Sequence, residues 1–290
     1  MAWAVIRRKD FPEILAFLKA RESTCVMLTS RLIDEDQALV PLKKNKLLVN
    51  RSVTTGTIQE VLLFTPGGLI LPVLDTLTHP SALDKGLAAY IENKAAQIHS
   101  IMGIASQVAV IEGMLKKQAT RVDYYLMTMK DYVKDTEQLP SIAGLHFRKA
   151  KVNDAKLLAP LQADYEKEEV LIDPERFNPS FSLLQLKKSL QTQIVVVAEL
   201  NGEIIAKAGT NAIGFNYCQI GGVFTKQKYR SMGIAKRLMR FLAGELEQQQ
   251  KKICLFVKKN NTPAINLYSG LGLTIYDNYR ISYYFGLSIF

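Results

Sequence analysis

The feature that most constrains this chain is a strand that runs through a short loop directly into a helix. The pattern predicts a strand from Tyr217 to Thr225 and a helix from about Met232 to Gln249, whose apolar side chains recur at the helical period. The first amides of such a helix have no carbonyl partners and point into the loop. Gly233 lets the backbone approach an anion closely, and the helix dipole favours negative charge. The segment is typical of a phosphate-binding loop, although a tight strand-to-helix turn has the same local pattern.

The rest of the 290 residues alternates predicted strands and helices, which indicates an α/β (α+β) fold. After an amphipathic helix over 10–22, the apolar run Cys25–Leu32 predicts a strand, and a longer helical stretch is predicted over about 81–97. Periodicity lapses between 135 and 145, where Pro, Ser and Gly accumulate. We therefore predict two domains, 1–140 and 145–290, each closing with strand, helix, strand, helix and strand.

Charge and composition exclude several functional classes. The net charge is +10, and most of the excess lies after residue 144, where six Lys and Arg crowd the acid-free stretch 226–240. Nucleic-acid binding through this stretch would need interleaved exposed aromatic side chains, and Phe241 lies on the predicted apolar helix face instead. No apolar window predicts a signal peptide or a membrane span. Three scattered cysteines and three scattered histidines indicate no disulfide framework and no metal site, so we expect a reduced, cytoplasmic protein.

Two motifs in register resemble the GNAT superfamily of acyl-CoA-dependent N-acyltransferases. The family's pyrophosphate loop is Gln or Arg, two residues, Gly, one residue, then Gly or Ala, which Arg230, Gly233 and Ala235 fit in order. The second motif is a strand followed by a short helix. It is matched by Leu255-Phe256-Val257, Asn261, Ala264, Leu267-Tyr268 and Leu271-Gly272-Leu273, with Leu273 where Phe is commoner. The resemblance implies a mixed, mostly antiparallel sheet flanked by helices, and acetyl-CoA as the acyl donor.

The resemblance also implies roles for individual residues. The strand before the loop would bind the pantetheine arm and thioester through backbone groups of Val223, Phe224 and Thr225, with a bulge at Gly221-Gly222. The pyrophosphate would be held by the loop and first helical turn, that is, by Arg230, Ser231, Met232, Gly233, Ile234, Ala235 and Lys236. Asn261 would cap the short helix and contact the cofactor. Tyr268 would be the general acid that protonates the departing thiolate, helped by basic surroundings because the transfer is uphill by ~2 kcal/mol.

The acceptor amine must also lose a proton. An alkyl amine of pKa ~10.4 is neutral in well under ~0.1% of molecules at pH 7, a cost of ~4.6 kcal/mol. Candidate bases are Glu199 at a predicted strand end, and Glu168 or Glu169 in the segment that borders the acceptor pocket by resemblance. Gln219 is a candidate for holding a water. Each is also compatible with an ordinary surface role.

The N-terminal half lacks the chemistry of the C-terminal half. Residues 75–80 contain neither the loop pattern nor a basic cluster, so this half is not expected to bind CoA. The whole chain resembles bacterial proteins that join a diverged GNAT-like half to an active one, and Glu168-Glu169-Val170 before Asp173-Pro174 extends that likeness. An unrelated α/β accessory domain is the alternative.

The sequence therefore predicts an N-acyltransferase that moves an acetyl group from acetyl-CoA to an amine by direct attack in a ternary complex. A CoA-binding regulatory or interaction protein without turnover is the alternative from another class. The acceptor, a small-molecule amine or a protein amine, is not specified by the sequence, and neither is the oligomeric state.

Overall fold

The computed structural model describes residues 3–33, 45–75, 85–115, 117–129 and 140–284. The N-terminal half contains β1 (Ala4–Val5), α1 (Phe11–Lys19), α2 (Glu22–Thr29), β2 (Lys46–Arg51), β3 (Ile58–Phe64), β4 (Leu69–Val73), α3 (Lys85–Lys94), β5 (Ser100–Ile104), α4 (Ala105–Met114) and β6 (Thr120–Thr128). The C-terminal half contains β7 (Leu145–Lys149), α5 (Ala155–Tyr165), the π-helical turn η4 (Glu166–Val170), α6 (Pro179–Thr192), β8 (Val195–Leu200), β9 (Glu203–Ile213), β10 (Tyr217–Thr225), α7 (Ile234–Glu247), β11 (Lys252–Lys258), α8 (Thr262–Ser269) and β12 (Thr274–Tyr283). Short 3-10 turns connect several of these elements: η1 (Arg8–Asp10), η2 (Ala95–Gln97), η3 (Val152–Asp154), η5 (Pro174–Arg176) and η6 (Gln227–Tyr229).

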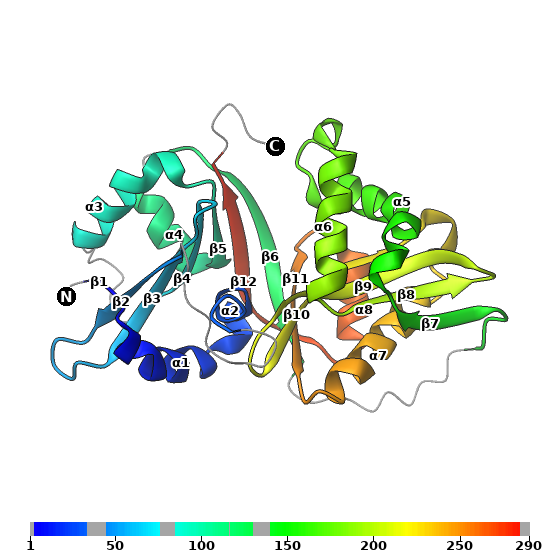
Figure 1. The fold of residues 1–290 in the computed structure, drawn as a ribbon, viewed down its shortest axis with the longest axis horizontal. Coiled ribbons are helices and arrows are strands. Elements are labelled where there is room, and N and C mark those ends of the chain that lie inside the picture. Colours follow the sequence, from blue (N-terminus) through cyan, green and yellow to red (C-terminus); the bar gives the residue numbers. More distant parts are fainter. Residues whose placement is uncertain (1–2, 34–44, 76–84, 116, 130–139, 285–290) are drawn as a thin grey trace.

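All twelve described strands form one sheet, in the order β1-β2-β3-β4-β5-β12-β6-β11-β10-β9-β8-β7. Only β4 with β5 and β10 with β11 pair in parallel, so the sheet is mixed and mostly antiparallel, as predicted. The last strand, β12, lies between β5 and β6, while β6 pairs with β11 of the C-terminal half. The two halves therefore exchange their closing strands across the middle of the sheet (Figure 1).

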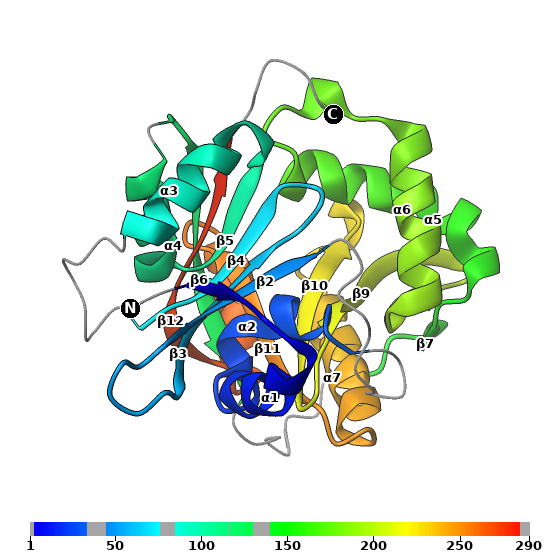
Figure 2. The same cartoon turned by 60° about the vertical axis from the view of Figure 1, so that its left-hand side comes forward.

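Helices cover both faces of this sheet (Figures 1 and 2). Alternate residues of the strands point to opposite faces, as Leu47 and Leu48 do: Leu47 packs with α1 and α2, and Leu48 with α3 and α4. In the C-terminal half, Val197 packs under α5 and α6, whereas Val196 packs with α7 and α8. In β11, Leu255 packs with α7 and α8, whereas its neighbour Cys254 points to the opposite face and packs with α2. Helix α2 therefore lies on the same face of the sheet as α5 and α6.

The segment predicted as a strand over Cys25–Leu32 is instead mostly helix, because α2 extends to Thr29. A short apolar run has no periodicity that separates a buried strand from a buried helix. Here Val26, Leu28 and Thr29 bury against the sheet, which favours the helix. The predicted helix over 81–97 is present from Lys85, and residues 81–84 lie outside the described part of the chain.

A buried carboxylate of the N-terminal half binds the turn that precedes β10 in the C-terminal half. Glu22 of α2 is 1% exposed and accepts hydrogen bonds from the amides of Phe215 (2.5 Å) and Asn216 (2.7 Å) in the turn between β9 and β10. Lys251 completes the turn by donating from Nζ to the carbonyls of Gly214 and Phe215, at 2.8 and 2.7 Å. The N-terminal half thereby fixes one end of the strand that leads into the site.

Candidate functional site

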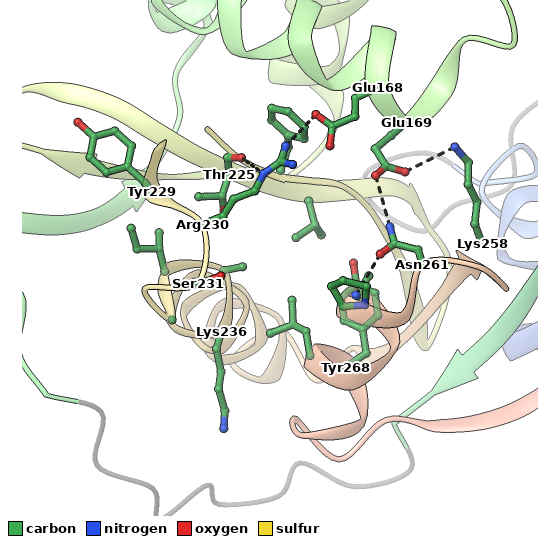
Figure 3. A pocket seen from close by; sticks show the side chains of 18 of the residues that line it. Glu168, Glu169, Thr225, Tyr229, Arg230, Ser231, Lys236, Lys258, Asn261 and Tyr268 are labelled. Atoms are coloured by element: carbon green, nitrogen blue, oxygen red, sulfur yellow. Dashed lines mark hydrogen bonds and ion pairs between the residues drawn. The ribbon is translucent and has the colours of Figure 1, made fainter. Parts of the chain in front are cut away.

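A cavity of about 710 Å³ opens where β10 and β11 part, bounded by α7, α8 and η4 (Figure 3). The parallel pairing of these strands is recorded only from Tyr217–Lys252 to Ile220–Leu255. Beyond it, β10 bulges against β9 between Gly221 and Phe224, with Gly222 at φ +62°. The bulge predicted at Gly221-Gly222 is therefore present, and it leaves the end of β10 facing the cavity.

Most of the predicted residues line this cavity. From the predicted set the lining contains Glu168, Glu169, Val223, Phe224, Thr225, Arg230, Ser231, Gly233, Ile234, Ala235, Lys236, Asn261 and Tyr268. Tyr229, Lys258, Asn260, Pro263, Ala264 and Leu267 line it as well. Met232 lies in the same loop with its side chain exposed, outside the lining set. Glu199 is not brought to the cavity: its carboxylate pairs with Arg148 of β7 at 2.5 Å.

The loop before α7 has the geometry of an anion site. Gly233 is the residue before the first helical residue, and its φ of +71° is a left-handed conformation that favours glycine. Gly233 has no side chain to cap the helix, so the first amides of α7 remain available to a ligand. A Cβ built at Gly233 would have no atom within 4 Å. The position is open, and a phosphate group fits its donors and its dipole.

The cations around the loop are held by acids that are distant in sequence. Arg230 donates from Nε to the Thr225 carbonyl (3.0 Å) and from Nη2 to Glu168 (2.8 Å), and this hydrogen bond raises the pKa of Arg230 (Figure 3). Lys258 lies 3.5 Å from Glu169. The η4 turn thus places two carboxylates over the cavity, each against a cation.

The acid-free basic stretch also has an acidic partner in the fold. Glu203 at the start of β9 accepts from Lys226 (2.8 Å), Lys228 (3.1 Å) and Tyr229 (2.8 Å). These hydrogen bonds, led by that of Lys226, lower the pKa of Glu203 to about 2. The positive charge of this stretch is therefore partly neutralised by an acid that lies more than twenty residues earlier in the sequence.

Asn261 caps the N-terminus of α8, and Tyr268 lies near the C-terminal end of the same helix. The Oδ1 atom of Asn261 accepts from the amide of Ala264 (3.1 Å), which caps the helix, and its Nδ2 donates to Glu169 (3.3 Å). Tyr268 is 8% exposed, and burial, with smaller effects of Tyr165 and Glu169, raises the pKa of its phenol. Basic surroundings were expected here, but burial dominates. The phenol consequently stays protonated at neutral pH and can donate.

Two residues that the sequence analysis missed hold the bulge. Lys207 of β9 is 5% exposed, donates from Nζ to the Gly222 carbonyl (3.0 Å) and lies 4.1 Å from the ring centroid of Tyr165. Burial lowers the pKa of Lys207 to about 7, against the charge of Glu166. Burial raises the pKa of Tyr165 to about 12, opposed by a backbone hydrogen bond with Gly222. The sequence signal that could have identified Lys207 is the presence of a lysine inside the apolar run Ile204–Ala208.

Other predicted features can be placed in the described part of the chain. Gln219 is buried, and its Nε2 atom has no hydrogen-bond partner among the described residues. The three cysteines are buried and free. The described residues include no group of His, Cys, Asp or Glu suited to a metal ion. None of the helices in that part of the chain is both long and apolar enough to span a bilayer.

Comparison with known proteins supports the resemblance stated from the motifs. Residues 159–273 match the model of the Acetyltransferase (GNAT) family, and they include the loop, Asn261 and Tyr268. No curated protein sequence matches the chain. The C-terminal half therefore contains a GNAT acetyltransferase domain, as predicted.

Solved structures resemble the chain over nearly its full length. A GNAT acetyltransferase from Colwellia psychrerythraea is 13% identical with a TM-score of 0.54, over 99% of this chain and 100% of the other. A tandem GNAT protein from the clavulanic acid biosynthesis pathway is 12% identical with a TM-score of 0.57, over 99% of both chains. A Drosophila protein is 10% identical with a TM-score of 0.71, also over 99% of both. At these identities the likeness is one of fold, and it is consistent with two GNAT-like domains.

Proposed function

We propose that this protein is an N-acyltransferase that moves an acetyl group from acetyl-CoA to an amine, with its site in the predicted domain 145–290. The observation that carries the proposal is the meeting of three features in one cavity: the amides before α7, the bulged end of β10 and the buried phenol of Tyr268. The first two features belong to one strand-to-helix segment, whereas Tyr268 lies on α8, in a separate segment. An ordinary strand-to-helix turn without a ligand would require neither a bulge in β10 nor a buried tyrosine in the same cavity.

The residues present fit an acyl-CoA. The α7 amides and the open position at Gly233 suit its pyrophosphate, and the backbone of Val223 to Thr225 suits its extended pantetheine arm. When bound, acetyl-CoA supplies an activated thioester for direct attack by the amine. The N-terminal half would then act as an accessory domain without a CoA site of its own.

The side chains divide the proton transfers between them. Tyr268 holds its proton at Oη within the cavity and would deliver it to the thiolate that leaves when the amine takes the acetyl group. Glu169 is the candidate to receive the acceptor's proton, because its carboxylate lies in the cavity beside Asn261 and Lys258. Glu168 pairs with Arg230 at 2.8 Å, a closer ion pair than the 3.5 Å between Glu169 and Lys258, so Glu169 is the carboxylate more readily available to the acceptor.

Tyr268→Phe tests this function. A positioned general acid contributes roughly 10²- to 10⁴-fold, so kcat should fall by about that range while the Kd for acetyl-CoA stays within about twofold. The assay is thiol release with a panel of primary amines, including a lysine peptide. Tyr276→Phe, at a position 55% exposed on β12, is the matched control.

Two results would contradict the proposal. Equal losses of kcat and acetyl-CoA affinity in Tyr268→Phe would argue against a specific role of Tyr268 as the general acid. Tight acetyl-CoA binding by the wild type, without turnover of any amine or peptide, would favour the regulatory CoA-binding protein instead.

A further inference from the structure

The exchange of closing strands brings a residue of the N-terminal half to the edge of the cavity. β6 pairs with β11 in antiparallel register, and Tyr124 is the partner of Lys258. Paired residues point to the same face of a sheet, and Lys258 lines the cavity. Tyr124 therefore lies beside the site on the face that carries α5 and η4, although it precedes the C-terminal domain by some twenty residues in the chain.

Tyr124 is the outer member of an aromatic wall on this face. Its ring packs edge-on against Phe256 of β11, with centroids 5.2 Å apart and an interplanar angle of 71°. Phe256 in turn stacks on Tyr279 of β12 at 4.8 Å and 5°. Tyr279 is buried, whereas Tyr124 and Phe256 are only half-buried. Neither ring is among the residues that line the cavity, but both keep exposed surface on the face of Lys258, which lines it and pairs with Tyr124.

A carboxylate lies among the phenols next to this wall. Glu169 contributes to raising the pKa of Tyr124, Tyr165 and Tyr268, in each case after the larger effect of burial. Its own contacts are Asn261 at 3.3 Å and Lys258 at 3.5 Å (Figure 3). The ammonium of Lys258 shows that a primary ammonium fits against this carboxylate.

The chemistry of these groups selects one ligand class. Aromatic faces attract a cation and bury apolar surface, and a carboxylate neutralises an ammonium. On the same face, the ammonium of Lys207 already lies 4.1 Å from the ring centroid of Tyr165. Arg230 lies 2.8 Å from Glu168, whereas Lys258 is 3.5 Å from Glu169, so Glu169 is the carboxylate with the looser ion pair, and an acceptor ammonium would take the place of Lys258 against it.

We propose that Tyr124 is a specificity-determining residue of the acceptor site, which with Phe256 and Glu169 binds a primary ammonium carried on an aromatic or bulky apolar group. This inference depends on the proposed acyltransferase function and assigns the N-terminal half a direct part in acceptor recognition. The accessory half then contributes an acceptor wall instead of a second CoA site.

Binding of phenethylamine to the full chain, measured by calorimetry with acetyl-CoA affinity determined on the same samples, tests the inference. Tyr124→Leu should weaken phenethylamine by about fivefold or more, the equivalent of ~1 kcal/mol for a lost ring contact, and leave acetyl-CoA binding unchanged. Tyr125→Leu, the next residue on the opposite face, is the control for a lost half-buried ring. Phenethyl alcohol tests the charge on the unaltered protein and should bind at least about tenfold more weakly than the amine.

The outcomes separate the two proposals. A wild type that binds acetyl-CoA but not phenethylamine, or that binds the amine and the alcohol equally, overturns the inference and leaves the acyltransferase function intact. If the folded Tyr124→Leu variant binds phenethylamine as tightly as the wild type, the inference is likewise overturned and the acyltransferase function is unaffected. Failure of the wild type to bind acetyl-CoA would instead refute the function on which the inference depends.

Discussion

Replacing Lys207 with Met should change how the stability of the protein depends on pH. The ammonium of Lys207 is buried against the Gly222 carbonyl and the Tyr165 ring, and its pKa falls from the ordinary 10.5 to about 7. Between these values the unfolded chain binds more protons at this side chain than the folded one. Wild-type stability therefore rises with pH across this window, and the gain is lost progressively as pH falls from 10.5 to about 7.

The magnitude follows from the size of the shift. Each unit of pKa is worth ~1.4 kcal/mol, so the full window corresponds to at most ~5 kcal/mol. Lys207→Met removes this dependence and also leaves the Gly222 carbonyl without its donor, a constant cost of ~1–3 kcal/mol. The unfolding free energy of the wild type minus that of the variant should thus rise with pH from about 7 to 10.

Urea denaturation at four pH values from 7 to 10 measures that difference. Lys187→Met on the exposed face of α6 controls for the loss of one positive charge and should give a flat difference. A flat difference for Lys207→Met as well would refute the argument, because Lys207 would then titrate alike in the folded and unfolded chain. It would also contradict the conclusion that burial at the bulge destabilises the charged form of Lys207.

Two further substitutions test contacts around the site. Glu22→Gln should lower the free energy of unfolding by about 2–4 kcal/mol, because an amide cannot accept from both Phe215 and Asn216 as the buried carboxylate does; unchanged urea stability would contradict this brace between the halves. Glu168→Gln should tighten acetyl-CoA binding about two- to fivefold at low salt, since it removes a carboxylate that competes for Arg230 in an exposed ion pair. Calorimetry with Glu175→Gln as the control measures this, and weaker binding would instead show that Glu168 positions Arg230.

Local chemistry explains why much of the site could be predicted from the sequence. A left-handed glycine before a helix, an Asn cap and a tyrosine two turns later are all set within short segments, and Gly233, Asn261 and Tyr268 line one cavity. The bulge at Gly221-Gly222 follows from two adjacent glycines in a strand in the same way.

Pairings between distant segments could not be predicted. Nothing in β12 specifies β5 and β6 as its neighbours, because the backbone of a strand can pair with any edge of suitable length and register. Tyr124 lies beside Lys258 only because β6 pairs with β11. Glu203 and Glu199 illustrate the same limit: one neutralises the basic stretch and the other pairs with Arg148, and neither partner is near in sequence. Side-chain partners across a sheet depend on register, which a single sequence does not reveal.

The measurement that tests the central claim most directly is calorimetric binding of acetyl-CoA to the wild type, Gly233→Glu and Gly233→Ala. The glutamate adds a carboxylate where the α7 amides face the ligand, whereas alanine adds only the backbone strain of a positive φ, with no atom within 4 Å of its Cβ. We expect the wild type and the alanine variant to bind and the glutamate variant to lose at least about tenfold in affinity. A folded wild type that does not bind, or a glutamate variant that binds as well as the wild type, would contradict the assignment of this loop to an acyl-CoA.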